Sequence, residues 1–222
     1  MDAVVTPKRL NHVRITDKKL IWIVPCGLLI ASAACLIIDT QVAAFFADEA
    51  SRKAINGPVR ESLEICESFG HGFGATLIII AVAVLDPWKW RLVPWLFASS
   101  LGAGLMANAI KHFVARTRPS HFQFTDRTVW ETFAATAQRG MGMQSFPSAH
   151  TATAVGLAVI LGTLYPRGRY YFFVLAALVG LQRIVSSAHF PSDVMAGAAV
   201  GWIVGTGCSI AVLKRQSSTI ES

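Results

Sequence analysis

One stretch of the sequence holds the residue types of a nucleophilic site. Arg183, His189 and Asp193 are spaced R-x5-H-x3-D. The Asp193 carboxylate is placed to accept an N–H of the His189 imidazole and fix its tautomer, which leaves the other ring nitrogen free to attack. The Arg183 guanidinium is a bidentate donor for an anion. The alternative is an ion pair that closes a helix turn and does no chemistry.

A second pair of cations lies earlier in the chain. Lys111 and Arg118 are spaced K-x6-R-P. Residues seven apart on a helix share one face, so the two cations point the same way. Because like charges repel, this orientation indicates an anion between them. The alternative is that both side chains reach along apolar surface toward a membrane interface.

A third cluster, Ser145 to His150, reads Ser-Phe-Pro-Ser-Ala-His and precedes an apolar run. Pro147 and Ser148 are typical of a helix start. A helix start offers free backbone N–H groups and the positive end of the helix dipole, which together bind anions. His150 lies in that first turn. The alternative is an ordinary helix cap with an incidental histidine.

Together the three clusters predict a site for phosphoryl transfer without a metal ion. They supply Lys111, Arg118 and Arg183 as cations, a helix N-terminus, and two histidines, one of which has a carboxylate neighbour. Cations stabilise the phosphoryl oxygens, one histidine attacks in line, and the other protonates the leaving oxygen. The four cysteines show no spacing typical of zinc ligands or of a disulfide framework.

The elements that must position these clusters are membrane helices. Of the 222 residues, 53% are hydrophobic and only 15% are charged, which argues against a disordered chain or an ordinary soluble domain. Apolar runs without strand-like alternation predict an all-α, polytopic membrane protein. We expect six transmembrane helices, at about 20–38, 70–85, 92–110, 149–164, 170–185 and 194–213. In such a chain the net charge of +7 indicates a basic cytoplasmic face or a phosphate site, and no nucleic acid partner.

Basic residues predict the orientation of these helices. Eleven Lys and Arg residues fall on the side of the two termini, against nine on the other side, four of which belong to the predicted site or lie beside it. We therefore expect a cytoplasmic N-terminal segment at 1–19, a six-helix membrane domain at 20–214 and a cytoplasmic tail at 215–222. We expect the first apolar run to be retained, because it is longer than the core of a typical signal peptide.

The loops on the predicted outer side carry short helices. Residues 40–68 predict two, with Pro58 in the first turn of the second. Residues 128–131 form a capping-box pattern that predicts a helix through about residue 137. We expect these segments to lie at the bilayer surface, with a direct role at the substrate as the alternative. Four nearby residues are expected to face water or lipid headgroups, with contact to a second phosphate or a headgroup at the rim of the site as the alternative: Arg116, His112, His121 and Arg127.

The three motifs, in this order and at the ends of predicted membrane helices, resemble those of the type-2 phosphatidic acid phosphatase family. That family is grouped with bacterial acid phosphatases and vanadium haloperoxidases. The resemblance implies that His189 forms a phosphohistidine, that Asp193 orients it, and that His150 is the general acid. It also implies that the phosphate ligands are Lys111, Arg118, Ser148, Ala149 through its backbone N–H, and Arg183. It implies no metal and no cofactor.

Two residues depart from the family pattern. Ala149 stands where glycine is usual, and Gln182 stands where serine is usual. A methyl group at residue 149 would narrow the phosphate site, or strain it if that position needs a positive φ. Neither change removes a group with a predicted catalytic role.

The implied function is hydrolysis of a lipid phosphate or diphosphate on the outer face, with the protein in a bacterial inner membrane. Candidate substrates are undecaprenyl diphosphate, phosphatidylglycerol phosphate, phosphatidic acid and lipid A. One alternative is a transferase that passes a phosphoryl or headgroup to another lipid. Another is a non-catalytic lipid-phosphate carrier. The sequence carries no pattern that chooses the lipid or the oligomeric state.

Overall fold

The computed structural model describes residues 18–48, 57–125, 127–133 and 144–221. The described chain is helical, and its only bridge of strand type joins Arg116 to Gln144. The α-helices are α1 (Lys18–Cys35), α2 (Asp39–Ala47), α4 (Gly57–Glu67), α5 (Gly72–Leu85), α6 (Val93–Lys111), α7 (Ala149–Leu164), α8 (Arg169–Val185) and α9 (Pro191–Glu221). Short 3-10 helices are η2 (Pro87–Leu92), η3 (Pro119–His121), η4 (Val129–Phe133) and η6 (Pro166–Gly168). The all-α prediction is confirmed.

Each of the six expected apolar runs forms a helix, but not all of these helices meet the length of a membrane span. By length and composition, three described segments are able to cross a membrane, namely Lys89–Lys111, Pro166–Val185 and Pro191–Gln216. The bent pairs Lys19–Cys35 with Asp39–Ala47 and Gly57–Glu67 with Gly72–Leu85 would raise the number to five. Ala149–Leu164 is apolar but shorter. The described residues therefore support a polytopic protein without confirming six spans.

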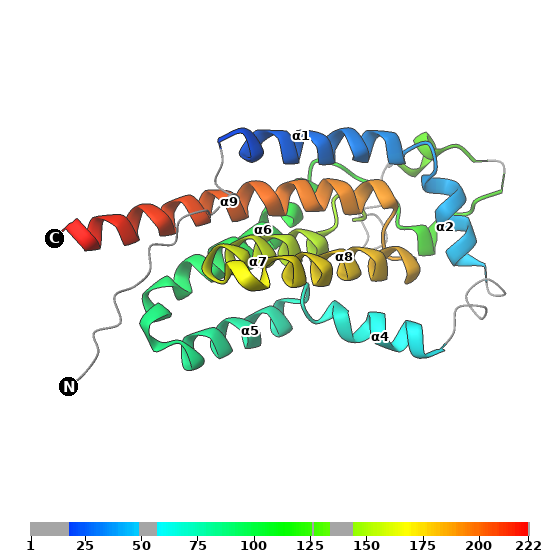
Figure 1. The fold of residues 1–222 in the computed structure, drawn as a ribbon. Helices are drawn as coiled ribbons and strands as arrows, with labels where there is room; N and C mark the ends of the chain where they lie inside the picture. Colours follow the sequence, from blue (N-terminus) through cyan, green and yellow to red (C-terminus); the bar gives the residue numbers. More distant parts are fainter. Residues whose placement is uncertain (1–17, 49–56, 126, 134–143, 222) are drawn as a thin grey trace.

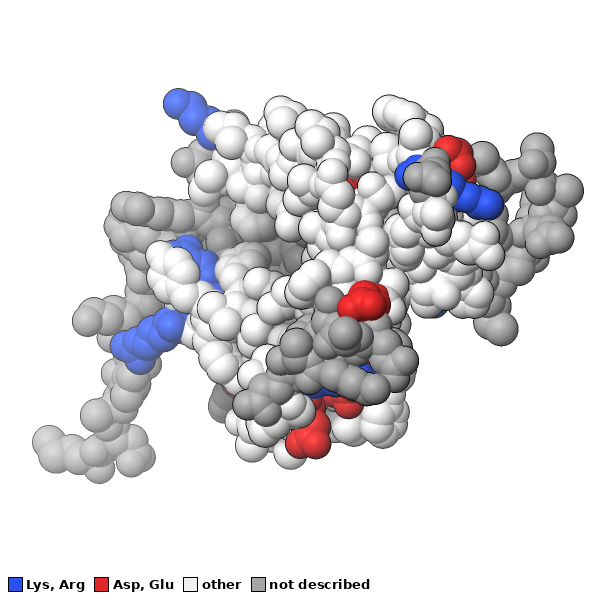
Figure 2. Space-filling view, turned by 90° about the vertical axis from the view of Figure 1, so that its right-hand side faces the viewer, with Lys and Arg blue, Asp and Glu red and all other residues white. Residues whose placement is uncertain are grey.

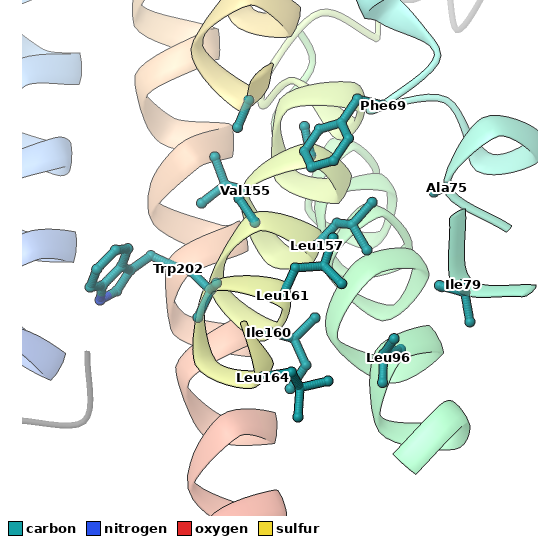
Figure 3. Packing of buried hydrophobic residues seen from close by; sticks show 14 of the residues in the cluster. Phe69, Ala75, Ile79, Leu96, Val155, Leu157, Ile160, Leu161, Leu164 and Trp202 are labelled. Atoms are coloured by element: carbon teal, nitrogen blue, oxygen red, sulfur yellow. The ribbon is translucent and has the colours of Figure 1, made fainter. Parts of the chain in front are cut away.

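Helix α7 is the centre of the bundle. Its residues from Thr151 to Leu164 are all buried, as expected of a helix that is apolar all round. It packs against α6, α8 and α9 (Figure 3). Small residues allow the closest approaches: a Cβ on Gly156 would lie 2.0 Å from the Ser99 carbonyl oxygen of α6. The core therefore depends on close packing of backbones as well as on apolar area.

The ends of four helices meet at one end of this bundle. Helices α6 and α8 finish there, while α7 and α9 begin there, on the right in Figure 1. Helices α2 and α4 lie at the same end, and α1 begins and α9 finishes at the other. Viewed toward this end, the surface in Figure 2 is mostly uncharged, with a few acidic and basic groups in separate patches.

The short helices of the loops follow the sequence prediction in part. Helices α2 and α4 form as expected, and Pro58 lies in the first turn of α4. One half of the capping box is present, because Glu131 Oε1 accepts hydrogen bonds from the backbone N–H and the hydroxyl of Thr128. The segment that it opens is the 3-10 helix Val129–Phe133. The rest of that expected helix, and most of the expected N-terminal segment, lie outside the described residues.

Candidate active site

His189 lies in the short turn between α8 and α9. Helix α8 is closed by Ser187, which has a φ of 55° and is the only described non-glycine residue with positive φ. This left-handed residue reverses the chain, and the amides of Ala188 and His189 then bond back to the Arg183 carbonyl. Asp193 follows in the first turn of α9 and accepts the Phe190 amide at 2.9 Å. The turn thereby brings the imidazole and the carboxylate to the same place.

The His189 imidazole is only 3% exposed and faces Asp193 through Nδ1. The distance from Nδ1 to Asp193 Oδ2 is 3.6 Å, which is longer than a hydrogen bond. Burial lowers the pKa of His189, and the neighbouring Asp193 carboxylate opposes that effect. A lowered pKa keeps the ring neutral, which is the nucleophilic form. Because Nδ1 faces Asp193, Nε2 is the nitrogen that remains for chemistry.

Helix α7 begins as the sequence predicts. Ser148 is its N-cap, and its Oγ accepts hydrogen bonds from the amide and the hydroxyl of Thr151. The amides of Ala149 and His150 are among those that helix geometry leaves without an intrahelical acceptor. The start of α7 is held against α9, since the Ser148 amide donates to the Asp193 carbonyl at 3.0 Å. The helix N-terminus thus lies beside the His189–Asp193 pair.

Three cations gather at the site, two of them beside this pair. Lys111 is buried in the last turn of α6, and Arg118 lies just before η3. Both interact electrostatically with His189. Arg118 Nε is a buried donor without a hydrogen-bond partner among the described residues. Arg183, at the end of α8, interacts electrostatically with Arg118 and with His150. Cations that gather despite their repulsion form a site that is suited to an anion.

The two departures from the family pattern fit this geometry. Ala149 does not have a positive φ, so its methyl group strains no backbone. Gln182 is buried, and its Oε1 accepts the Arg183 Nε–H at 2.6 Å. Gln182 therefore fixes the direction of the Arg183 guanidinium.

Glu67, at the end of α4, is a residue that the sequence reasoning missed. Its Oε2 lies 2.6 Å from Arg183 Nη2, and its Oε1 lies 3.5 Å from His150 Nε2. Beyond it, His71 caps α5, and its ring centroid is 5.7 Å from that of His150. One outer segment therefore reaches the site directly, where we had expected it to lie at the bilayer surface.

Arg116 was predicted wrongly. It was expected to face water or headgroups, yet it is completely buried and forms ion pairs with Asp39 and Asp193. The other three residues of that group, His112, His121 and Arg127, are exposed as expected. The sequence signal for Arg116 was weak, because its two acidic partners lie 77 residues away on either side.

A helical bundle in which three cations, a helix N-terminus and a buried His–Asp pair meet is typical of a membrane protein that handles phosphate. Residues 92–217 match the family model of the PAP2 superfamily. The chain therefore belongs to this superfamily, which confirms the resemblance drawn from the three motifs. Its apolar helices and its family make it an integral membrane protein.

Phosphatases of two bacteria are similar to part of the chain. A lipid A 1-phosphatase of Rhizobium etli is 36% identical over 107 residues, covering 48% of this chain and 44% of that protein. A decaprenylphosphoryl-5-phosphoribose phosphatase of Mycobacterium tuberculosis is 31% identical over 137 residues, covering 61% of this chain and 70% of that protein. The chain thus spans less than half the length of the Rhizobium relative.

Two crystal structures share the fold. The PAP2-type phosphatidylglycerolphosphate phosphatase of Bacillus subtilis has a TM-score of 0.61 at 16% identity, covering 86% of this chain and 96% of that one. LpxE of Aquifex aeolicus has a TM-score of 0.55 at 22% identity, covering 73% and 90%. At these identities the likeness concerns the fold alone.

Proposed function

We propose that this protein hydrolyses a lipid phosphate or diphosphate through a phosphohistidine intermediate and without a metal ion. The observation that carries the proposal is the buried His189–Asp193 pair, which has Lys111 and Arg118 beside it, while Arg183 lies beside Arg118. A buried neutral imidazole beside a carboxylate is a competent nucleophile. Buried cations need an anion to offset their repulsion, and a phosphoryl group supplies one.

The proposed reaction has two displacements at phosphorus. In the first, His189 Nε2 forms a bond to phosphorus while the bond to the lipid oxygen breaks. That oxygen takes a proton from His150, which requires His150 to be protonated when substrate binds. In the second, neutral His150 takes a proton from water, the water oxygen bonds to phosphorus, and the N–P bond breaks to release phosphate.

The remaining site residues hold the phosphoryl oxygens in this mechanism. Lys111, Arg118 and Arg183 stabilise the charge that spreads over them, and the Ala149 amide and Ser148 complete the site at the start of α7. Because Nδ1 of His189 faces Asp193, the carboxylate fixes the tautomer and stabilises the cationic phosphohistidine.

The proposed substrates are lipids because the relatives named above are lipid A and polyprenyl-linked phosphatases and the bundle is apolar. Undecaprenyl diphosphate, phosphatidylglycerol phosphate, phosphatidic acid and lipid A are the candidates. We further propose six membrane spans, with α7 among them, and a site that faces the outside of a bacterial inner membrane. The basic 3-10 turns η2 and η6 at the opposite end of the bundle support this orientation.

Phosphate release from these four lipids in detergent, with excess chelator present, tests the proposed function. We expect release from at least one lipid to persist in chelator and to fall by about 10⁴-fold or more in His189→Ala. His112→Ala is the matched control, because His112 is exposed and lies next to Lys111. Loss of activity in chelator, or full activity in His189→Ala, would contradict the proposal.

A further inference from the structure

The Arg116 guanidinium bridges two buried carboxylates beside the site. Nη1 lies 2.5 Å from Asp193 Oδ1, and Nη2 lies 2.7 Å from Asp39 Oδ2. Nε donates to Thr132 Oγ1 at 3.0 Å. The side chains of Arg116, Asp39 and Asp193 all have zero exposure to solvent. The arginine therefore joins both carboxylates in a region that solvent does not contact.

The rest of the environment fixes this arginine in place. The guanidinium carbon lies 4.4 Å from the ring centroid of Phe133 and 4.1 Å from that of Phe190. Aromatic faces at these distances attract a cation and restrict its orientation. Phe190 directly follows His189, so the ring that contacts the guanidinium belongs to the same turn as the nucleophile.

Asp39 ties a second element into the network. Its Oδ1 accepts the Ser192 amide at 3.0 Å, and its Oδ2 accepts the Ser192 hydroxyl as well as Arg116. The Ser192 carbonyl accepts a hydrogen bond from the Ser32 hydroxyl of α1 at 2.8 Å. The junction of α1 and α2 is thereby bonded to the first turn of α9, where Asp193 lies.

The network leaves little freedom to Asp193. Its Oδ1 accepts from Arg116, and its Oδ2 accepts from Ser145 Oγ at 2.6 Å and from the Phe190 amide at 2.9 Å. The His189 ring faces Oδ2 from the site through its Nδ1. Burying two carboxylates and one guanidinium costs free energy of desolvation. Well-packed apolar side chains in their place often make a protein equally stable or more stable. A role in chemistry accounts for the arrangement better than stability alone.

We propose that Arg116 and Asp39 are positioning residues that act through Asp193 to set the orientation and the basicity of the His189 nucleophile. This inference rests on the proposed function of His189. The positive charge of Arg116 partly neutralises Asp193. The negative charge of Asp39 partly neutralises Arg116 and so weakens the effect of Arg116 on Asp193. Neither side chain needs to contact phosphate in this role.

The sign of each effect follows from the charges. The other charged or titratable groups that face His189 are Asp193 of α9, Lys111 of α6, Arg118 before η3 and His150 of α7. Removing the Arg116 charge leaves Asp193 less neutralised and favours the imidazolium form of His189. Removing the Asp39 charge strengthens the pull of Arg116 on Asp193 and favours neutral imidazole. The two changes therefore act in opposite directions.

The test is the pH dependence of phosphoenzyme formation from one lipid substrate by the full-length protein in detergent. The variants are Asp39→Asn, Arg116→Gln and the double variant. We expect the acid limb of the rate profile to move to lower pH in Asp39→Asn and to higher pH in Arg116→Gln, each by about half a unit or more. The double variant is expected to return toward the wild-type limb. Titration of the substrate is common to all four proteins and cancels in the comparison.

A second measurement separates positioning from phosphate binding and from misfolding. Inorganic phosphate is used as a competitive inhibitor. We expect Asp39→Asn and Arg116→Lys to keep the wild-type inhibition constant within about twofold while the rate of phosphoenzyme formation falls by about tenfold or more. An unchanged inhibition constant shows that the site is folded. Arg116→Lys keeps the charge, so its acid limb is expected to lie closer to that of the wild type than the limb of Arg116→Gln does. Arg127→Gln, which changes an exposed arginine, is the matched control.

The outcomes are distinct. If the wild-type protein forms no phosphoenzyme that depends on His189, the proposed function itself is wrong. If the wild-type protein does form this phosphoenzyme, two results would overturn the inference. One is that Asp39→Asn forms it at the wild-type rate, and the other is that Asp39→Asn forms it more slowly with no shift of the acid limb. An inhibition constant for phosphate that rises with either substitution would instead make these residues part of the phosphate site, and would also overturn it.

Discussion

The Glu67 carboxylate contacts two side chains, those of Arg183 and His150, that act on the substrate in the proposed mechanism. It lies 2.6 Å from Arg183 and 3.5 Å from His150. A phosphoryl group bound to Arg183 must therefore share the guanidinium with this carboxylate or displace it. The substitution Glu67→Gln removes the charge and keeps the shape of the side chain. We expect it to tighten the binding of phosphate.

The expected size follows from the charge separation. The two charges are the Glu67 carboxylate and a phosphoryl group bound to Arg183. At a separation of about 5 Å, two unit charges interact by roughly 1.5–3 kcal/mol at an effective dielectric constant of about 20–40. The Glu67 side chain is 26% exposed, so solvent screens it and the lower end of that range applies. A change of about 1.4 kcal/mol is tenfold in a binding constant. Arg183 keeps its direction in the variant, because Gln182 still accepts from its Nε.

The assay is competitive inhibition of lipid hydrolysis by inorganic phosphate. We expect the inhibition constant of Glu67→Gln to fall about tenfold, while that of the control Glu64→Gln stays unchanged. Glu64 lies on the same helix, is 53% exposed and pairs with Arg60. A constant that rises in Glu67→Gln would refute the reasoning, because it would mean that the carboxylate helps Arg183 to bind phosphate.

Three further predictions follow from the same geometry. A Cβ on Gly197 would lie 2.4 Å from the Ser148 carbonyl oxygen, so Gly197→Ala is expected to lower stability by about 1–3 kcal/mol and to reduce activity, which thermal unfolding and phosphate release measure together. Lys111→Met removes one buried cation and is expected to raise KM about 10- to 100-fold, a change that would be absent if Lys111 only reached toward headgroups. Because burial lowers the pKa of His189 below the ordinary 6.5, the nucleophile stays neutral in mild acid, and the acid limb of phosphoenzyme formation is expected below pH 6.5; a limb above that value would contradict a buried neutral ring.

Local patterns predicted the parts of the site that lie close together in the chain. The R-x5-H-x3-D spacing predicted the turn that joins His189 to Asp193, and the Pro-Ser start predicted the N-cap of α7 at Ser148. These features depend on residues within about one to three helical turns, where spacing fixes geometry. Helix positions were predicted for the same reason, since apolar runs mark them directly.

Long-range partners were beyond the reach of the sequence. Asp39 and Glu67 have no spacing pattern that links them to Arg116 and Arg183, and the packing of α2 and α4 against the helix ends brings them together. Arg116 was expected to face water or headgroups because a lone charge is most often solvated. The number of spans stays a prediction, since α5 has only 14 residues and α7 only 16, which is short for a membrane span.

The central claim is that His189 carries the phosphoryl group. The direct test is to react the protein with a lipid labelled in its phosphate, quench the reaction within one turnover and measure the label on the protein. We predict an acid-labile, alkali-stable phosphoprotein that is present in the wild-type protein and absent in His189→Ala. In His150→Ala it is expected to form slowly and to break down slowly, because His150 is the proposed acid of the first step and the proposed base of the second. Label that persists in His189→Ala, or hydrolysis that proceeds with no labelled protein at any time, would contradict the account.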